Sequence, residues 1–213
     1  RQRQMCIRDR DYITEYSYGV YESLNLVVPR LLGGSNHENL GEKSAVYERL
    51  IHSYPREQVL EFTRHLPTYW GDQPIVAAPA YVGILTFFFF VLALFVVRQR
   101  AKWWLLAGVI LSLLLSWGKN FNLLTDLMID YFPLYNKFRA VSSVQTILEF
   151  CMPVLAILGL YTYLTDEKRA HYKQYLYYTG GIVAGLLLLL WLAKGSLSFV
   201  GASDAYYAQA YGE

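Results

Sequence analysis

Residues 81–117 read YVGILTFFFFVLALFVV, RQRAK and WWLLAGVILSLLLSW, which are two uncharged apolar runs joined by a short basic loop. Two further runs, 144–164 and 175–193, contain a single charged residue between them, Glu149. About 20 apolar residues in a helix cross the hydrocarbon core of a bilayer. The sequence therefore predicts an α-helical polytopic membrane protein with four transmembrane helices, at about residues 79–97, 103–117, 144–164 and 175–194.

The distribution of lysine and arginine between the loops predicts the orientation of these helices. Residues 98–102 carry three positive charges and no negative one, and residues 165–174 contain three more lysines and arginines. Short loops rich in lysine and arginine stay in the cytoplasm. We therefore expect both loops to be cytoplasmic, and residues 11–76, 118–143 and 199–213 to be extracytoplasmic.

Composition and the two chain ends set further bounds. The chain is 54% hydrophobic and has a net charge of +2, so its charge does not indicate a nucleic-acid partner. Its two cysteines, Cys6 and Cys151, do not indicate a disulfide framework. Residues 1–10, RQRQMCIRDR, resemble a translated sequencing adaptor, and we set them aside from the fold prediction. We expect the chain to be an internal fragment of a larger membrane protein.

Residues 11–76 predict a mostly helical extracytoplasmic cap that precedes a membrane domain over residues 77–198. Residues 44–62 have the apolar periodicity of an amphipathic helix, broken near Pro55. Residues 66–74, LPTYWGDQP, form an aromatic loop that leads into the first predicted span. We expect this cap to rest on the outer side of the membrane domain.

Several short motifs occur in order between residue 11 and residue 213, at regular places relative to the apolar runs. They are Ser17-Tyr18-Gly19 with Glu22, Val28-Pro29, Gly33-Gly34, Tyr69-Trp70-Gly71-Asp72-Gln73-Pro74, Tyr81-Val82-Gly83 and Tyr135-Asn136-Lys137-Phe138-Arg139-Ala140-Val141-Ser142. Their order, spacing and placement together resemble the bacterial YfhO family of multi-span membrane proteins, in the form typical of Bacteroidetes.

This resemblance implies a membrane glycosyltransferase of the GT-C type in the bacterial inner membrane. Such an enzyme moves a sugar from a polyprenyl-phosphate donor to an extracytoplasmic glycan or lipid acceptor. The family's catalytic carboxylate belongs to an early extracytoplasmic loop, so we assign no catalytic residue in this chain and expect the fragment alone to be inactive. A lipid or polysaccharide transporter and a non-catalytic membrane scaffold are the alternative functions.

Arg139 and Lys137, in the motif that carries the resemblance, are candidates for holding the donor phosphate. A guanidinium offers a planar fork to phosphate oxygens, and the lysine adds a second positive charge at the same membrane face. The alternative is that both side chains snorkel or pair with lipid headgroups. The residues alone leave both interpretations open.

Glu149 lies inside the third predicted span, where an unpaired carboxylate costs a few kcal/mol. Pro153 lacks the N–H that would bond the Glu149 carbonyl, so we expect the helix to kink and leave that oxygen available. These features predict a polar pocket that opens to the outside, with Arg139 or Lys137 as the partner of Glu149. The alternative is a structural ion pair that holds the loop to the span.

A second candidate group for ligand binding lies in the cap and consists of Glu22, Arg30, Trp70 and Asp72. The Trp70 ring offers a face on which a sugar stacks, and the neighbouring carboxylate of Asp72 suits sugar hydroxyls. A tryptophan at the entrance of a span is also a common interfacial anchor. Both interpretations stay open at this point.

The sequence does not predict a metal site or identify a cofactor. Its four histidines lack the spacing of metal ligands. Asp126 and Asp130 share one face of a helix and could bind a divalent cation only with a third ligand, the alternative being a solvated face. In the fourth predicted span, Gly181 and Gly185 form a GxxxG pair that we expect to pack against another helix of this chain.

Overall fold

A computed structural model describes residues 12–133, 135–137, 140–166, 169–196 and 200 of the 213-residue chain. These residues form helices and connecting loops, with no β-strand among them. An isolated antiparallel bridge joins Glu38 to Leu66. The helical class that the sequence predicts is therefore confirmed for the described part of the chain.

The helices are joined by connections of differing length, and residues 27–44 and 65–83 are long segments without helix. The α-helices are α2 (Ala45–Leu50), α3 (Arg56–Arg64), α4 (Ile84–Val96), α5 (Ala101–Ser116), α6 (Asn122–Tyr131), α7 (Gln145–Thr165) and α8 (Arg169–Ala193). Single turns of 3-10 helix lie between them or flank them: η1 (Tyr21–Leu26), η2 (Gly118–Phe121), η3 (Tyr135–Lys137), η4 (Val141–Val144) and η5 (Lys194–Ser196). The predicted break near Pro55 is confirmed, because Pro55 is the residue before α3.

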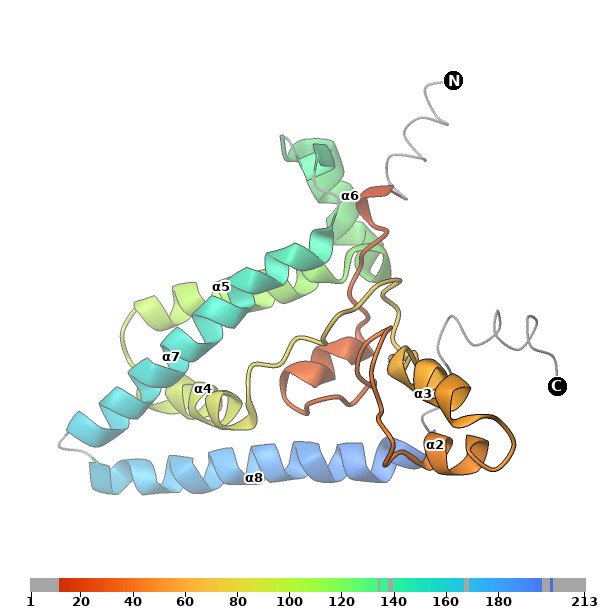
Figure 1. Cartoon of the computed structure of the whole chain (residues 1–213). Coiled ribbons are helices and arrows are strands. Elements are labelled where there is room, and N and C mark those ends of the chain that lie inside the picture. Colours follow the sequence, from red (N-terminus) through yellow and green to blue (C-terminus); the bar gives the residue numbers. More distant parts are fainter. Residues whose placement is uncertain (1–11, 134, 138–139, 167–168, 197–199, 201–213) are drawn as a thin grey trace.

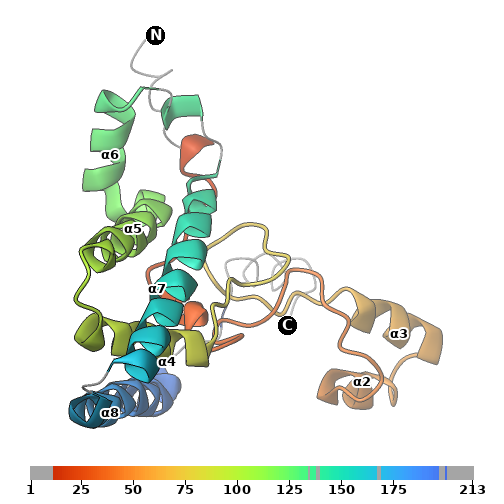
Figure 2. The ribbon, with the colours of Figure 1, turned by 90° about the vertical axis from the view of Figure 1, so that its left-hand side faces the viewer.

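Figure 1 shows how the apolar helices are arranged. α5 and α7 run side by side, whereas α8 diverges from α7, and the connection from α4 to α5 lies at the end where α7 finishes and α8 begins. α2 and α3 project at the opposite end. Figure 2 shows that α4 lies across α8 instead of running alongside it.

α7 packs against α4 and α5 at small residues. A Cβ on Gly159 of α7 would lie 2.5 Å from the Cβ of Ala93 in α4, and a Cβ on Gly108 of α5 would lie 3.2 Å from the Sγ of Cys151. Small residues at a helix crossing let the two backbones approach closely. Around these crossings lies the main apolar core, whose most buried members include Leu92, Ala93, Val96, Val97, Leu148 and Leu155.

Two helices are long and apolar enough to cross a membrane, and they correspond to the third and fourth predicted spans. They cover Val141–Thr165 and Tyr172–Ala193. A third span arises only if α5 and the following helix to Tyr131 count as one, although this pair bends by 108°. The four-span prediction is therefore supported for two helices and not confirmed for the other two.

The first two predicted spans are shorter helices because of their end residues. α4 has 13 residues, or about 20 Å of helix, which is less than the roughly 30 Å of hydrocarbon. Its start is delayed to Ile84 because Gly83, at φ 103°, does not have a helical backbone. α5 ends at Ser116, and Gly118, at φ 45°, turns the chain away.

The exposed surface of the two long helices is strongly apolar. Only 28% of an 18-residue window within Val141–Thr165, and 11% of one within Tyr172–Ala193, is buried within the chain. On α8 the large exposed side chains are Tyr177, Tyr178, Ile182, Leu187, Leu188, Leu189, Trp191 and Leu192. An apolar surface of this extent is unfavourable in water and suits lipid. These helices thus support the prediction of a membrane protein.

The GxxxG pair of α8 does not make the contact that we expected. No atom of another described segment lies within 4 Å of the position that a Cβ would take on Gly181 or Gly185. The stripe of α8 that packs within the chain instead contains Tyr172, Thr179 and Val183, all buried. The expectation of packing inside this chain is therefore wrong for the described residues.

We predict that Gly159→Ala destabilises the protein by about 1–3 kcal/mol, because the added methyl overlaps Ala93 in a packed crossing. Unfolding of the purified protein in detergent micelles measures the change. The matched control is Gly181→Ala, where the added methyl meets open space, and alanine is the better helix former. Equal stability of the two variants would contradict the close crossing of α4 and α7.

Candidate functional site

Residues 17–19 lie against the C-terminal end of α5. The last carbonyl groups of a helix have no partner within the helix, and here the N–H of Tyr18 donates to the carbonyl of Ser116 at 2.8 Å. The Ser17 hydroxyl donates to the Thr14 carbonyl at 2.6 Å and accepts from the N–H of Lys119 at 2.9 Å. These bonds hold the motif at residues 17–19 at the end of the apolar helix.

Further hydrogen bonds tie the same segment to both sides of the long 118–143 loop. The Asn120 side chain donates to the Tyr18 carbonyl at 3.0 Å, and the N–H of Ser142, in η4, donates to the Tyr16 carbonyl at 3.3 Å. Gly118 must be glycine at this contact, because it has a φ of 45° and an added Cβ would overlap the Ser17 hydroxyl. The segment therefore lies between the end of α5 and the start of α7.

A buried carboxylate joins this segment to the aromatic loop. Glu22 is 2% exposed, and it accepts hydrogen bonds from the N–H of Gly19 at 2.8 Å and the N–H of Asp72 at 2.6 Å. It also accepts from the Gln73 amide at 3.1 Å and from the Tyr69 hydroxyl. Four donors satisfy the two oxygens of a carboxylate that is out of contact with water. We call these five residues the Glu22 network.

The loop can reach Glu22 because residue 71 is a glycine. A Cβ on Gly71 would overlap both Oε1 of Glu22 and the hydroxyl of Tyr69. The aromatic loop is thus built to bring its backbone against the carboxylate.

Two tyrosine hydroxyls close to Glu22 are held in their neutral form. Burial raises the pKa of Tyr18 to about 12, and the Glu22 and Glu149 carboxylates add to this rise while the Gln145 amide opposes it. Burial, followed by the hydrogen bond to Glu22, raises the pKa of Tyr69 well above its usual range. Both hydroxyls therefore stay hydrogen-bond donors at physiological pH.

A cavity of about 270 Å³ lies beside the Glu22 network, at the first turn of α7. Its lining comprises Tyr18, Gln73, Ile75, Val76, Ala77, Ala78, Pro79, Ala80, Ser142, Ser143 and Gln145. Gln145 is 6% exposed, and its Nε2 has no hydrogen-bond partner among the described residues. We call this space the Gln145 cavity.

Of the four cap candidates, the structure brings together Glu22 and Asp72. Asp72 is exposed and places a carboxylate oxygen 2.9 Å from the position of a Cβ on Gly19. Trp70 is half-buried, and its ring lies 3.1 Å from the position of a Cβ on Gly33, which has a φ of 88°. Asp72 therefore contacts Glu22, whereas the Trp70 ring lies against the segment at Gly33.

Arg30 makes its ion pair elsewhere. It has an unusual φ of 59°, and its Nη2 donates to both carboxylate oxygens of Glu38 at 2.6 and 2.7 Å. The Thr68 hydroxyl and the Arg30 guanidinium hold the pKa of Glu38 below its usual range. This pair borders a second cavity of about 360 Å³, which shares residues 77–79 with the Gln145 cavity. Because Glu38 also accepts a hydrogen bond from the Thr68 hydroxyl, Arg30 helps to hold the start of the aromatic loop through Glu38.

The membrane-face candidates have different outcomes. Lys137 is exposed in η3, and Arg139 lies outside the described residues. The pairing of either residue with Glu149 therefore stays a prediction. Glu149 is exposed on α7, and its charge acts on Tyr18, a neighbour that the sequence did not suggest. α7 continues through Pro153 as one helix.

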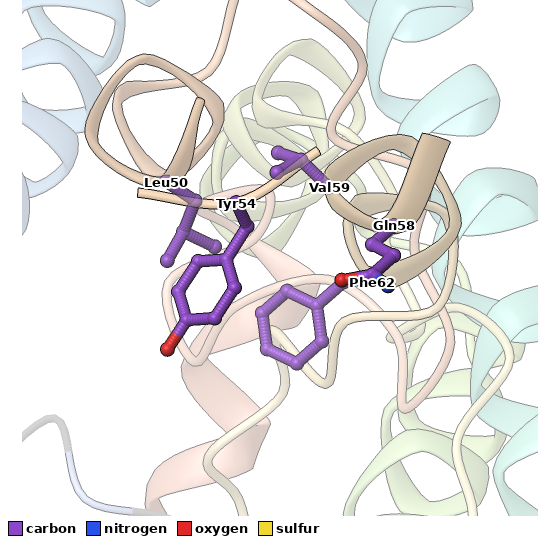
Figure 3. A pocket seen from close by; sticks show the side chains of 5 residues that line it. All are labelled: Leu50, Tyr54, Gln58, Val59 and Phe62. Carbon is purple, nitrogen blue, oxygen red and sulfur yellow. The ribbon is translucent and has the colours of Figure 1, made fainter. Parts of the chain in front are cut away.

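A third cavity, of about 340 Å³, lies between α2 and α3 and is nearly all apolar. Figure 3 shows its lining residues Leu50, Tyr54, Gln58, Val59 and Phe62, with the rings of Tyr54 and Phe62 side by side. It offers packing surface instead of reactive groups. Among the described residues, no group of three histidine, cysteine, aspartate or glutamate side chains could hold a metal ion.

Sequence reasoning missed Tyr18, Tyr69, Gln73 and Gln145 as site residues. The first three belong to the motifs that carry the family resemblance, so that signal was present. Gln145 had no comparable signal beyond being a polar residue at the start of an apolar run.

Comparisons with protein-family models, curated proteins and solved structures found no match for the chain. The resemblance to the YfhO family therefore stays a prediction.

We predict that the protein loses stability as the pH rises above about 10, because the unfolded chain releases the protons of Tyr18 and Tyr69 before the folded chain does. Each tyrosine contributes a slope of about 1.4 kcal/mol per pH unit in this range. Melting temperatures between pH 9 and pH 12 measure the effect. Tyr69→Phe should flatten the decline, and the exposed Tyr21→Phe should not. Parallel curves for all three proteins would contradict the burial of Tyr69 against Glu22.

Proposed function

We propose that the chain is part of a membrane glycosyltransferase of the GT-C type. In this proposal it transfers a sugar from a polyprenyl-phosphate donor to a glycan or lipid acceptor on the extracytoplasmic side of a bacterial inner membrane. The observation that supports the proposal is the meeting of motifs that are about 50 residues apart in the sequence, at Gly19, Glu22, Tyr69, Asp72 and Gln73. These are the motifs on which the family resemblance rests.

The position of this meeting point suits a lipid-linked substrate. The Glu22 network and the Gln145 cavity adjoin the N-terminal end of Val141–Thr165, a helix long enough to span a membrane. A donor whose polyprenyl chain lies in the bilayer presents its phosphate and sugar at such an end. The site offers amide and hydroxyl groups there, which are the partners that sugar hydroxyls need.

The residues of the site divide into positioning and binding groups. Glu22 accepts four hydrogen bonds from the protein itself, so we propose that it positions the loop and does not react. Asp72 and Glu149 are exposed carboxylates, and both suit contacts with sugar hydroxyls. Arg139 and Lys137 remain the proposed holders of the donor phosphate. We assign no catalytic base among the described residues.

The test measures sugar transfer in isolated membranes. The membranes come from cells that express the complete gene from which this chain derives. With a labelled polyprenyl-phosphate sugar, label should move into the glycan or lipid fraction. Arg139→Lys keeps the charge but loses the planar fork, so the donor concentration for half-maximal transfer should rise by tenfold or more. Arg100→Lys, in the opposite basic loop, is the control and should leave the donor dependence unchanged.

Two results would count against the proposal. Absence of transfer at any donor concentration, with normal accumulation in the membrane, would contradict the glycosyltransferase assignment and favour a transporter or scaffold. Equal donor dependence for Arg139→Lys and Arg100→Lys would remove Arg139 from the donor site.

A further inference from the structure

The Gln145 cavity contains a polar group that needs a partner. The Gln145 side chain is buried and lines the cavity, and its Nε2 makes no hydrogen bond of good geometry to a described residue, although the amide lies close enough to the Tyr18 hydroxyl to oppose the rise of its pKa. Buried amide groups almost always have a hydrogen-bond partner, because an unpaired one loses the bonds that it made to water. The unpaired Nε2 therefore indicates that a hydrogen-bond acceptor enters this cavity.

The surroundings of Gln145 are rigid. The Gln73 amide donates to Glu22, which fixes this side chain at the cavity wall. The Tyr18 hydroxyl donates to the Glu22 carbonyl at 2.8 Å, so its oxygen is also held in place. Ser143, which also lines the cavity, donates its hydroxyl to the Ala140 carbonyl at 2.7 Å. Polar groups that are held in this way can bind the hydroxyls of a ligand with little further loss of side-chain entropy.

The remaining wall is apolar and comes from residues 75–80, which read IVAAPA. A pyranose ring has a face of C–H groups and an edge of hydroxyls. A cavity with one apolar wall and one edge of amides and hydroxyls matches both. With about 270 Å³, it is at the small end of the range for ligand pockets and suits one sugar ring instead of an oligosaccharide.

The charges around the cavity disfavour an anion. No lysine or arginine is among the described residues that line it. The carboxylates of Glu22 and Glu149 lie close enough to act on Tyr18 at the cavity wall. Negative charges in this position repel a phosphate at short range and leave an uncharged sugar unaffected.

We propose that the Gln145 cavity binds one uncharged sugar ring, with the Gln145 Nε2 donating to a ring or hydroxyl oxygen, and that it excludes the phosphate. The inference rests on the proposed glycosyltransferase function and assigns the sugar to this cavity. The donor phosphate then has to lie outside it, on the side of Lys137 and Arg139.

Direct binding to the 213-residue chain in lipid nanodiscs tests this assignment. The probes are the methyl glycosides of glucose, galactose and mannose, observed by saturation-transfer NMR. At least one should bind, with a dissociation constant on the order of millimolar, as expected for a ligand of this size. Inorganic phosphate and glucose 1-phosphate should not displace it.

Gln145→Leu removes the amide and keeps a similar side-chain volume. Glycoside binding should weaken at least tenfold, whereas the melting temperature should stay equal or rise, because an unpaired buried amide is replaced by an apolar group. Gln58→Leu makes the same change in the cavity between α2 and α3 and should leave glycoside binding unchanged. A lower melting temperature for Gln145→Leu would show that Gln145 has a partner within the protein, and would overturn the inference.

The remaining outcomes distinguish failure of the sugar site from failure of the glycosyltransferase function. No binding of any of the three glycosides, equal binding by wild type and Gln145→Leu, or displacement by inorganic phosphate would each overturn the assignment. If glycosides bind through Gln145 but sugar transfer never occurs, the sugar site stands and the glycosyltransferase function fails. If transfer occurs and Gln145→Leu leaves it unchanged, the enzyme function stands and this site is wrong.

Discussion

The buried Glu22 carboxylate is the constraint on which the rest of the site depends. A carboxylate out of contact with water is unfavourable unless donors surround it. Glu22 meets this need with groups from two distant segments, Gly19 on one side and Tyr69, Asp72 and Gln73 on the other. The aromatic loop is therefore held against the segment that closes the end of α5. The 75–80 segment that follows this loop forms a wall of the Gln145 cavity.

The membrane part presents this site at the end of a long apolar helix. α7 crosses α4 and α5 where Gly159, Ala93 and Gly108 allow close approach, and the start of α7 also supplies Gln145. The Ser112 hydroxyl of α5 donates to the Val144 carbonyl at 2.6 Å, which ties the two helices together beside Gln145. The packing that holds the helices in place thus also positions the cavity, and α8 is left with an apolar surface that suits lipid.

Much of the membrane part could be predicted from the sequence, because apolar length alone identifies α7 and α8. The predicted span at residues 79–97 is longer than α4, because the non-helical backbone of Gly83 delays the start of the helix despite the apolar residues around it. In the site, residue chemistry suggested Glu22 and Asp72, which the structure brings into contact. The sequence around Arg30 gave no sign that Arg30 pairs with Glu38. The bond from Tyr69 to Glu22 joins residues 47 positions apart, and local periodicity carries no information on such contacts.

Amide hydrogen exchange tests the role of Glu22 most directly, because two backbone N–H groups donate to its carboxylate. In the wild-type chain in nanodiscs, the amides of Gly19 and Asp72 should be protected although both lie in irregular segments. In Glu22→Gln, one acceptor oxygen becomes a donor facing other donors, so both amides should exchange at least 100-fold faster. The amides of Leu92 and Leu155, in the crossing of α4 and α7, should keep their protection. Unchanged protection of Gly19 and Asp72 in Glu22→Gln would contradict the central role of this carboxylate.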